Sequence, residues 1–163
     1  MSQLSSIEEV IAALQAGKPV LVSDAEDREN EGDAIIAAEF ATQEWLAWMI
    51  RYTSGYICAP MSRDRANKLE LPLMWVNNKD PHQTAYTVSV DAASRSSTGI
   101  SAAERALTGR VLADPNSTPD SLIRPGHVIP LRAKPGGVLE RPGHTEAAVD
   151  LMMLAGLQPV ALM

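Results

Sequence analysis

Residues 19–38 have the sequence PVLVSDAEDRENEGDAIIAA, in which an acidic stretch separates two short apolar runs. The runs at 19–22 and 34–38 have the length and composition of buried strands. The stretch between them, residues 24–33, carries six carboxylates around one arginine, Arg28. This pattern predicts two strands of a sheet joined by a short acidic loop.

The density of negative charge in this loop allows two interpretations. A run of like charges is commonly a solvated surface loop. However, the flanking strands leave the carboxylates little room to separate, and carboxylates held close together normally require a cation or a proton. Oxygen ligands at this density suit magnesium or manganese rather than zinc. The loop is therefore a candidate site for a divalent metal.

The rest of the chain predicts helices and strands in irregular alternation. Ser6 and Glu9 form a capping box before a run of helical periodicity that ends at Gly17. Further helices are expected at 42–51, 62–69, 101–107 and 145–156 (the last capped by Thr145), strands at 54–59, 84–91 and 128–132, and turns at 114–126. No repeat or shift in composition divides the chain. We therefore expect one domain, residues 1–163, with a layered α+β fold around a mixed sheet.

Bulk composition excludes several classes of protein. A chain of 163 residues with 45% apolar residues can bury its own core. A net charge of -6 argues against nucleic-acid binding, which requires an excess of Lys and Arg. The N-terminus lacks a signal-peptide pattern, and no window approaches the ~20 apolar residues that cross a bilayer, so we expect a cytoplasmic protein without a membrane partner. The single cysteine, Cys58, is expected to be a small core residue.

The tetrapeptide Arg-Pro-Gly-His occurs twice, at 124–127 and at 141–144. In the second copy, Gly143, His144 and Thr145 lie where the last helix is expected to begin. Unpaired backbone amides and the helix dipole at that point, beside Arg141, are suited to binding a phosphate. The alternative is a histidine that only caps the helix or belongs to the core.

A fourth segment, 96–105, is rich in hydroxyl groups, contains Gly99 and leads into a helix. It is either a ligand-binding loop or an ordinary helix cap. Together, a divalent-metal site, a phosphate site and titratable histidines suggest proton-transfer chemistry on a phosphorylated small molecule.

Four ordered motifs resemble those of the 3,4-dihydroxy-2-butanone 4-phosphate synthase family. They are Asp27-Arg-Glu-Asn-Glu-Gly-Asp33, Thr98-Gly-Ile-Ser101, Arg124-Pro-Gly-His-Val128 and Gly143-His-Thr-Glu-Ala147. The resemblance implies a three-layer α+β sandwich and a homodimer with active sites near the subunit interface. It implies a magnesium-dependent lyase of riboflavin biosynthesis that converts D-ribulose 5-phosphate to L-3,4-dihydroxy-2-butanone 4-phosphate and formate.

The resemblance also implies roles for individual residues. Glu29 and His144 would bind Mg²⁺ or Mn²⁺, and His127, Asp33 and Glu29 would be catalytic, with Asp33 and His127 moving protons. The implied substrate-binding residues are Arg28, Glu29, Asp33, Thr98, Arg141, Pro142, Gly143, His144 and Thr145.

The chain departs from the family pattern at three places. Ala25 stands where an aspartate is frequent, and Glu104 replaces the aspartate usual before Arg105. Family members continue beyond residues 158–163 into a strand with a catalytic glutamate, and a missing strand would expose an apolar sheet edge.

Three readings of these departures stay open. In the first, the protein is the synthase, and the chain is either complete or a fragment, a frameshifted product or half of a longer polypeptide, such as a fusion with a GTP cyclohydrolase II domain. In the second, it is a relative that only binds a sugar phosphate or acts as a dimer partner. In the third, it is a magnesium-dependent enzyme that uses another phosphosugar.

Overall fold

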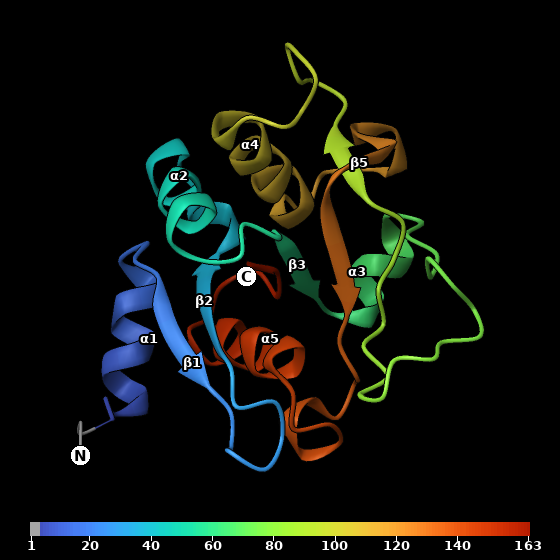
Figure 1. The fold of residues 1–163 in the computed structure, drawn as a ribbon. Coiled ribbons are helices and arrows are strands. Elements are labelled where there is room, and N and C mark those ends of the chain that lie inside the picture. Colours follow the sequence, from blue (N-terminus) through green and yellow to red (C-terminus); the bar gives the residue numbers. More distant parts are fainter. Residues whose placement is uncertain (1–3) are drawn as a thin grey trace.

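The structure is a computed structural model that describes residues 4–163, and it contains helices on both faces of a mixed sheet (Figure 1). The helices are α1 (Ile7–Gln15), α2 (Gln43–Tyr52), α3 (Arg63–Lys68), α4 (Ala102–Ala113) and α5 (His144–Leu154), with short 3-10 helices η1 (Ala38–Phe40), η2 (Pro119–Ser121) and η3 (Gly137–Leu139). The strands are β1 (Val20–Ser23), β2 (Gly32–Ala37), β3 (Cys58–Met61), β4 (Val90–Ala92), β5 (Leu122–Arg132) and β6 (Ala161–Leu162). No helix of the described part of the chain is long and apolar enough to cross a bilayer.

The strands form two three-stranded sheets, β1-β2-β6 and β3-β5-β4, that are joined at their inner edges. Among the strands of residues 4–163, only β3 and β5 pair in parallel, which makes the sheet mixed. Cys58 and Met163 exchange two backbone hydrogen bonds of 2.9 Å, and Met61 bridges Val160. These contacts set β6 beside β3, so the strand order across the molecule is β1-β2-β6-β3-β5-β4.

The side chains of β2 alternate between two hydrophobic clusters, one on each face of the sheet. Ile35 and Ala37 pack with residues of α1 and α5, whereas Ala34 and Ile36 pack with residues of α2 and α4. The same alternation continues in β6, where Ala161 and Leu162 belong to opposite clusters. Because both faces are covered by helices, the α+β, three-layer sandwich implied by the resemblance is confirmed (Figure 1).

Several predicted elements are confirmed with small changes in their ends. The capping box of Ser6 and Glu9 is present, with Glu9 N–H donating to Ser6 Oγ over 3.2 Å. The helix expected at 101–107 continues to Ala113, because the buried Arg65 donates to the backbone oxygens of Leu112 and Asp114 over 2.7 and 2.5 Å. A long-range cap of this kind has no local signal in the sequence.

The predicted strands at 84–91 and 128–132 have the wrong limits. Thr87 N–H donates to the backbone oxygen of Pro130, whereas Val88 N–H donates to the backbone oxygen of Pro72. The segment before Val90 is thus hydrogen-bonded to two different segments in turn and does not form a continuous strand with either. Strand β5 begins at Leu122, inside the segment expected to be turns, because Leu122 pairs with β4 and a register shift accommodates the residues that follow. The strand expected at 54–59 begins only at Cys58.

The last residues of the chain do not lie at an edge of the sheet. Ala161 and Leu162 pair with β2, and Met163 bonds to Cys58 of β3. This stretch has a neighbour on each side, but Gly32–Ile35 of β2 pair with β1 alone among the described residues, so this part of β2 has the free edge that was expected.

Candidate active site

A cavity of about 650 Å³ lies between the β1–β2 loop, the start of α5 and the segments around Thr53 and Thr84. It is lined by the predicted residues Arg28, Glu29, Asp33, Arg141, His144 and Thr145. A neighbouring cavity of about 590 Å³ is lined by Pro142 and Gly143 and shares Arg28 and His144 with the first. The fold therefore brings together most of the site residues predicted from the sequence.

Asp24 folds the acidic loop around its own carboxylate. Its oxygens accept N–H of Glu31 over 2.9 Å, N–H of Glu29 over 3.1 Å and Arg28 Nη1 over 2.8 Å. Burial would raise the pKa of Asp24, but these hydrogen bonds outweigh it and lower the pKa to about 2. The loop is therefore structured by an ionised carboxylate, while residues 25–27 and 30–32 remain exposed to solvent, as expected for a surface loop.

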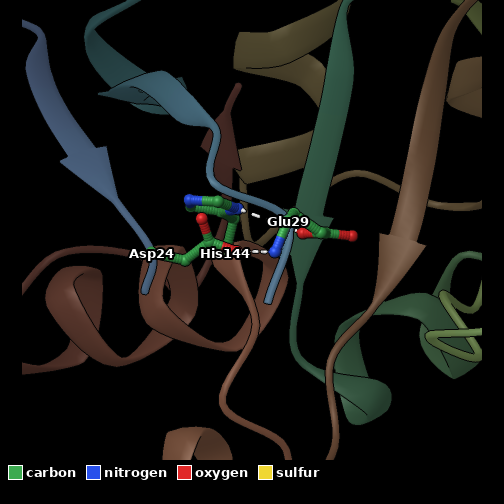
Figure 2. A group of neighbouring side chains, drawn as sticks. All are labelled: Asp24, Glu29 and His144. Atoms are coloured by element: carbon green, nitrogen blue, oxygen red, sulfur yellow. Dashed lines mark hydrogen bonds and ion pairs between the residues drawn. The ribbon is translucent and has the colours of Figure 1, made fainter. Parts of the chain in front are cut away.

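Asp24, Glu29 and His144 form a cluster whose ligand atoms lie within 4.8 Å of one another (Figure 2). His144 Nδ1 lies 3.6 Å from Glu29 Oε2 and 3.5 Å from Asp33 Oδ2. Its other ring nitrogen, Nε2, is buried without a hydrogen-bond partner among the described residues. A donor set dominated by carboxylate oxygens, with an unpaired buried imidazole nitrogen, fits a magnesium or manganese ion.

Asp33 lies at the start of β2, beside the cluster of Asp24, Glu29 and His144. Burial raises the pKa of its carboxyl, and the negative charges of Glu31, Glu29 and Asp24 raise it further, against an opposing effect of His144. A carboxyl group that retains its proton more strongly than usual is suited to accepting and returning protons.

Arg141 is held rigidly at the wall of the cavity by three different partners. Its Nη1 donates to Glu146 Oε2 over 2.5 Å, its Nη2 to Thr84 Oγ1 over 3.0 Å and its Nε to the backbone oxygen of His82 over 3.0 Å. Glu146 is 1% exposed, so the pair is shielded from water. The guanidinium is thereby fixed beside the first turn of α5.

The first turn of α5 is open to a ligand because its cap has no side chain. The N-cap is Gly143, without a side-chain hydrogen bond, so the prediction of Thr145 as the cap is wrong. A Cβ at Gly143 would lie 2.2 Å from Arg141 Nη1, which only glycine avoids. Gly143 therefore lies directly beside the Arg141 guanidinium, so the N-terminus of α5 and this positive charge are adjacent, as expected for an anion site.

His127 and Thr98 lie away from this cavity within one chain. Leu131 lines the cavity, and His127 precedes it by four residues on β5, roughly 13 Å along an extended strand. Thr98 is exposed in the loop that precedes α4. Figure 1 shows this loop and the start of β5 at the opposite end of the sheet from the β1–β2 loop.

Comparison with known proteins identifies the family. A family model described as 3,4-dihydroxy-2-butanone 4-phosphate synthase matches residues 8–163. The chain belongs to the 3,4-dihydroxy-2-butanone 4-phosphate synthase family. The riboflavin biosynthesis protein RibBA of Nocardia farcinica (strain IFM 10152) is 60% identical over 162 residues, 99% of this chain and 39% of that protein. RibBA of Salinispora arenicola (strain CNS-205) is 58% identical over 163 residues, 100% of this chain and 39% of that protein.

Solved structures of the synthase family agree with the fold. A crystal structure of a 3,4-dihydroxy-2-butanone 4-phosphate synthase in complex with two magnesium ions has a TM-score of 0.96 and 54% identity, covering 98% of this chain and 74% of that one. The family resemblance is thus confirmed. The chain spans 39% of the length of the two RibBA relatives.

Three residues of the candidate site were not predicted from the sequence. Asp24 lies in one cluster with Glu29 and His144, Glu146 orients Arg141, and His82 Nε2 lies 3.7 Å from Glu29 Oε1. A signal for Asp24 was its position at the start of the acidic stretch. Glu146 lies within the motif Gly143-His-Thr-Glu-Ala147, whereas His82 carried no signal beyond its residue type.

Cys58 lines the large cavity but is not a reactive thiol. Burial raises the pKa of Cys58 to about 12, and the nearby charge of Asp33 adds to this increase. The thiol is 6% exposed, so its description as a small core residue is confirmed.

Proposed function

We propose that the chain converts D-ribulose 5-phosphate to L-3,4-dihydroxy-2-butanone 4-phosphate and formate, as a lyase of riboflavin biosynthesis. The observation that carries this proposal is the juxtaposition of Glu29 and His144 with Arg141 at one cavity. A divalent-metal site next to an anion site matches a phosphorylated sugar with adjacent oxygens. Membership of the synthase family supports the choice of this sugar.

Glu29 and His144 would hold Mg²⁺ or Mn²⁺. Asp24 already accepts three hydrogen bonds, so its main task is to fold the loop that carries Glu29. Arg28 Nη1 contacts the carboxylates of both Asp24 and Glu29 and offsets their charge. When bound, the metal would supply Lewis-acid stabilisation of negative charge on the sugar oxygens.

The phosphate would bind between Arg141 and the first turn of α5, against Pro142, Gly143 and Thr145. Arg141 has five N–H donors, of which three donate to protein acceptors, so two remain for the ligand. The partial positive charge at the helix N-terminus adds to the attraction. Arg28 and Asp33, at the cavity wall, would then contact the sugar.

Asp33 and His127 would move protons between neighbouring carbons of the sugar. The raised pKa of Asp33 supports its part in this transfer. His127 and Thr98 lie at the other end of the sheet, so they would reach a sugar only in the site of a second copy. This distance supports the expected homodimer with active sites near the subunit interface.

The test is release of formate from D-ribulose 5-phosphate in the presence of Mg²⁺. We expect formate from the wild-type chain, a loss of at least about 100-fold in Glu29→Gln, and no loss in Glu26→Gln. Glu26 is an exposed carboxylate of the same loop and is the matched control. Removal of metal by a chelator, and its return, should abolish and restore the signal.

A folded chain that releases no formate would contradict the proposal. Binding of ribulose 5-phosphate without turnover would then identify a non-catalytic relative, and turnover of a different pentose or tetrose phosphate would identify another phosphosugar enzyme. Fusion to a GTP cyclohydrolase II domain in a longer parent protein and a cytoplasmic location stay predictions from the sequence.

A further inference from the structure

His127 has an asymmetric environment at the start of β5. Its Nδ1 lies 2.8 Å from Asp91 Oδ2, and its backbone N–H donates to Asp91 Oδ1 over 2.9 Å. The ring's other nitrogen, Nε2, has no hydrogen-bond partner among residues 4–163, and the side chain is 36% exposed. One edge of the imidazole is therefore held by the protein while the other is accessible to a ligand.

Asp91 is buried, and its carboxylate is restrained by close neighbours. The residue is 1% exposed and lies on β4, opposite Ile123 of β5. Arg95 Nε lies 3.7 Å from Asp91 Oδ2 and is the charged group that faces the pair from the loop before α4. Gly99 approaches so closely that a Cβ there would lie 2.1 Å from Asp91 Oδ2. A carboxylate this confined has a single orientation.

We propose that Asp91 is a positioning residue that holds His127 as its Nδ1–H tautomer and directs the lone pair of Nε2 outward. An ionised carboxylate can only accept hydrogen bonds, so the ring nitrogen that faces it must carry the proton. The neutral ring then has its acceptor on the accessible edge, as a proton-accepting histidine requires. The catalytic role of this pair rests on the proposed function. The predicted tautomer of His127 does not depend on the proposed function.

The first test is a long-range ¹H–¹⁵N correlation spectrum of the wild-type chain at pH 8, with the His127 signals assigned by comparison with His127→Gln. We expect a protonated Nδ1 and an unprotonated Nε2. In Asp91→Asn the tautomer should shift towards Nε2–H, because an amide can donate to Nδ1. A neutral His127 that carries its proton on Nε2 in the wild-type chain would overturn the proposal, and this outcome is independent of turnover.

The second test is formate release by variants of the pair. We expect Asp91→Asn to lose about 100- to 10,000-fold in kcat with a small change in KM. Asp120→Asn, the same change at an exposed carboxylate, should have no effect. In a chain that already carries His127→Ala, adding Asp91→Asn should lower kcat by less than about threefold, because both substitutions disable the same proton transfer.

These outcomes separate the two proposals. Circular dichroism and the thermal midpoint identify any variant that fails to fold. Equal turnover of wild type and folded Asp91→Asn would overturn the positioning role. No formate from any variant would contradict the proposed function, and the tautomer measured in the wild-type chain would still decide the role of Asp91.

Discussion

At the scale of single residues, position 126 has no room for a side chain, so only glycine fits there. A Cβ at this position would lie 2.0 Å from the carbonyl carbon of Val90 and 2.2 Å from the backbone nitrogen of Asp91. We expect Gly126→Ala to lower the free energy of unfolding by about 1–3 kcal/mol, because β5 must move away from β4. Urea denaturation followed by circular dichroism measures this change.

Gly32→Ala is the matched control, since a Cβ there would meet only the backbone oxygen of Val22 at 3.9 Å. Its effect should stay within about 0.5 kcal/mol. Equal unfolding midpoints for the two variants would contradict the close contact between β4 and β5.

At the scale of elements, Glu104 joins the first turn of α4 to the loop before it. Its carboxylate accepts N–H of Ser96, Ser97 and Gly99 over 2.7–3.0 Å and the Ser97 hydroxyl over 2.7 Å. The hydroxyl bond of Ser97 lowers the pKa most, burial opposes it, and the backbone bonds add to the lowering, so that the pKa is about 2. The substitution of Glu104 for the family's aspartate therefore keeps a structural carboxylate.

The lowered pKa makes this loop sensitive to acid. Because the folded pKa lies below the ordinary value of 4.5, Glu104 stabilises the fold fully above about pH 4.5 and loses this contribution as the pH falls towards 2. We expect Glu104→Gln to unfold more easily than wild type at pH 7 and the difference to shrink near pH 3, in urea titrations at both values. Glu44→Gln, an exposed carboxylate in the first turn of α2, should show no such trend.

At the scale of the whole molecule, a metal bound by Glu29 and His144 would connect the β1–β2 loop to α5. These segments lie about 115 residues apart in the chain, so an ion that binds only the folded state stabilises the tertiary structure. We expect Mg²⁺ or Mn²⁺ at 100 times its Kd to add about 2.7 kcal/mol to the free energy of unfolding. Calorimetry with and without metal measures the shift in Tm.

The metal-dependent shift should vanish in Glu29→Gln and persist in Glu26→Gln. A shift of equal size in both variants would mean that the ion binds elsewhere in the acidic loop.

Local patterns in the sequence were sufficient for a large part of the fold. The capping box of α1 and the apolar runs of β1 and β2 depend on neighbours within a few residues, and all three are found near the predicted positions. The motifs around Glu29 and His144 were also sufficient to predict one shared site, because the family resemblance covers both.

The errors occur where distant contacts override local composition. Turn-forming residues before His127 suggested a loop, but pairing with β4 draws them into a strand. Arg65 extends α4 from 47 residues away in the chain, which no local pattern indicates. Propensity is a weak preference that tertiary hydrogen bonds readily exceed.

The sequence alone thus determined the family, the layered α+β fold and the chemical character of the site, since each depends on residue types and their spacing. Only the tertiary structure decided that Asp24 and His82 lie beside Glu29, that Glu146 fixes Arg141, and that His127 pairs with Asp91 at the far end of the sheet. The physical reason is that distances between residues remote in the chain depend on strand order and helix packing, which no short stretch of sequence encodes.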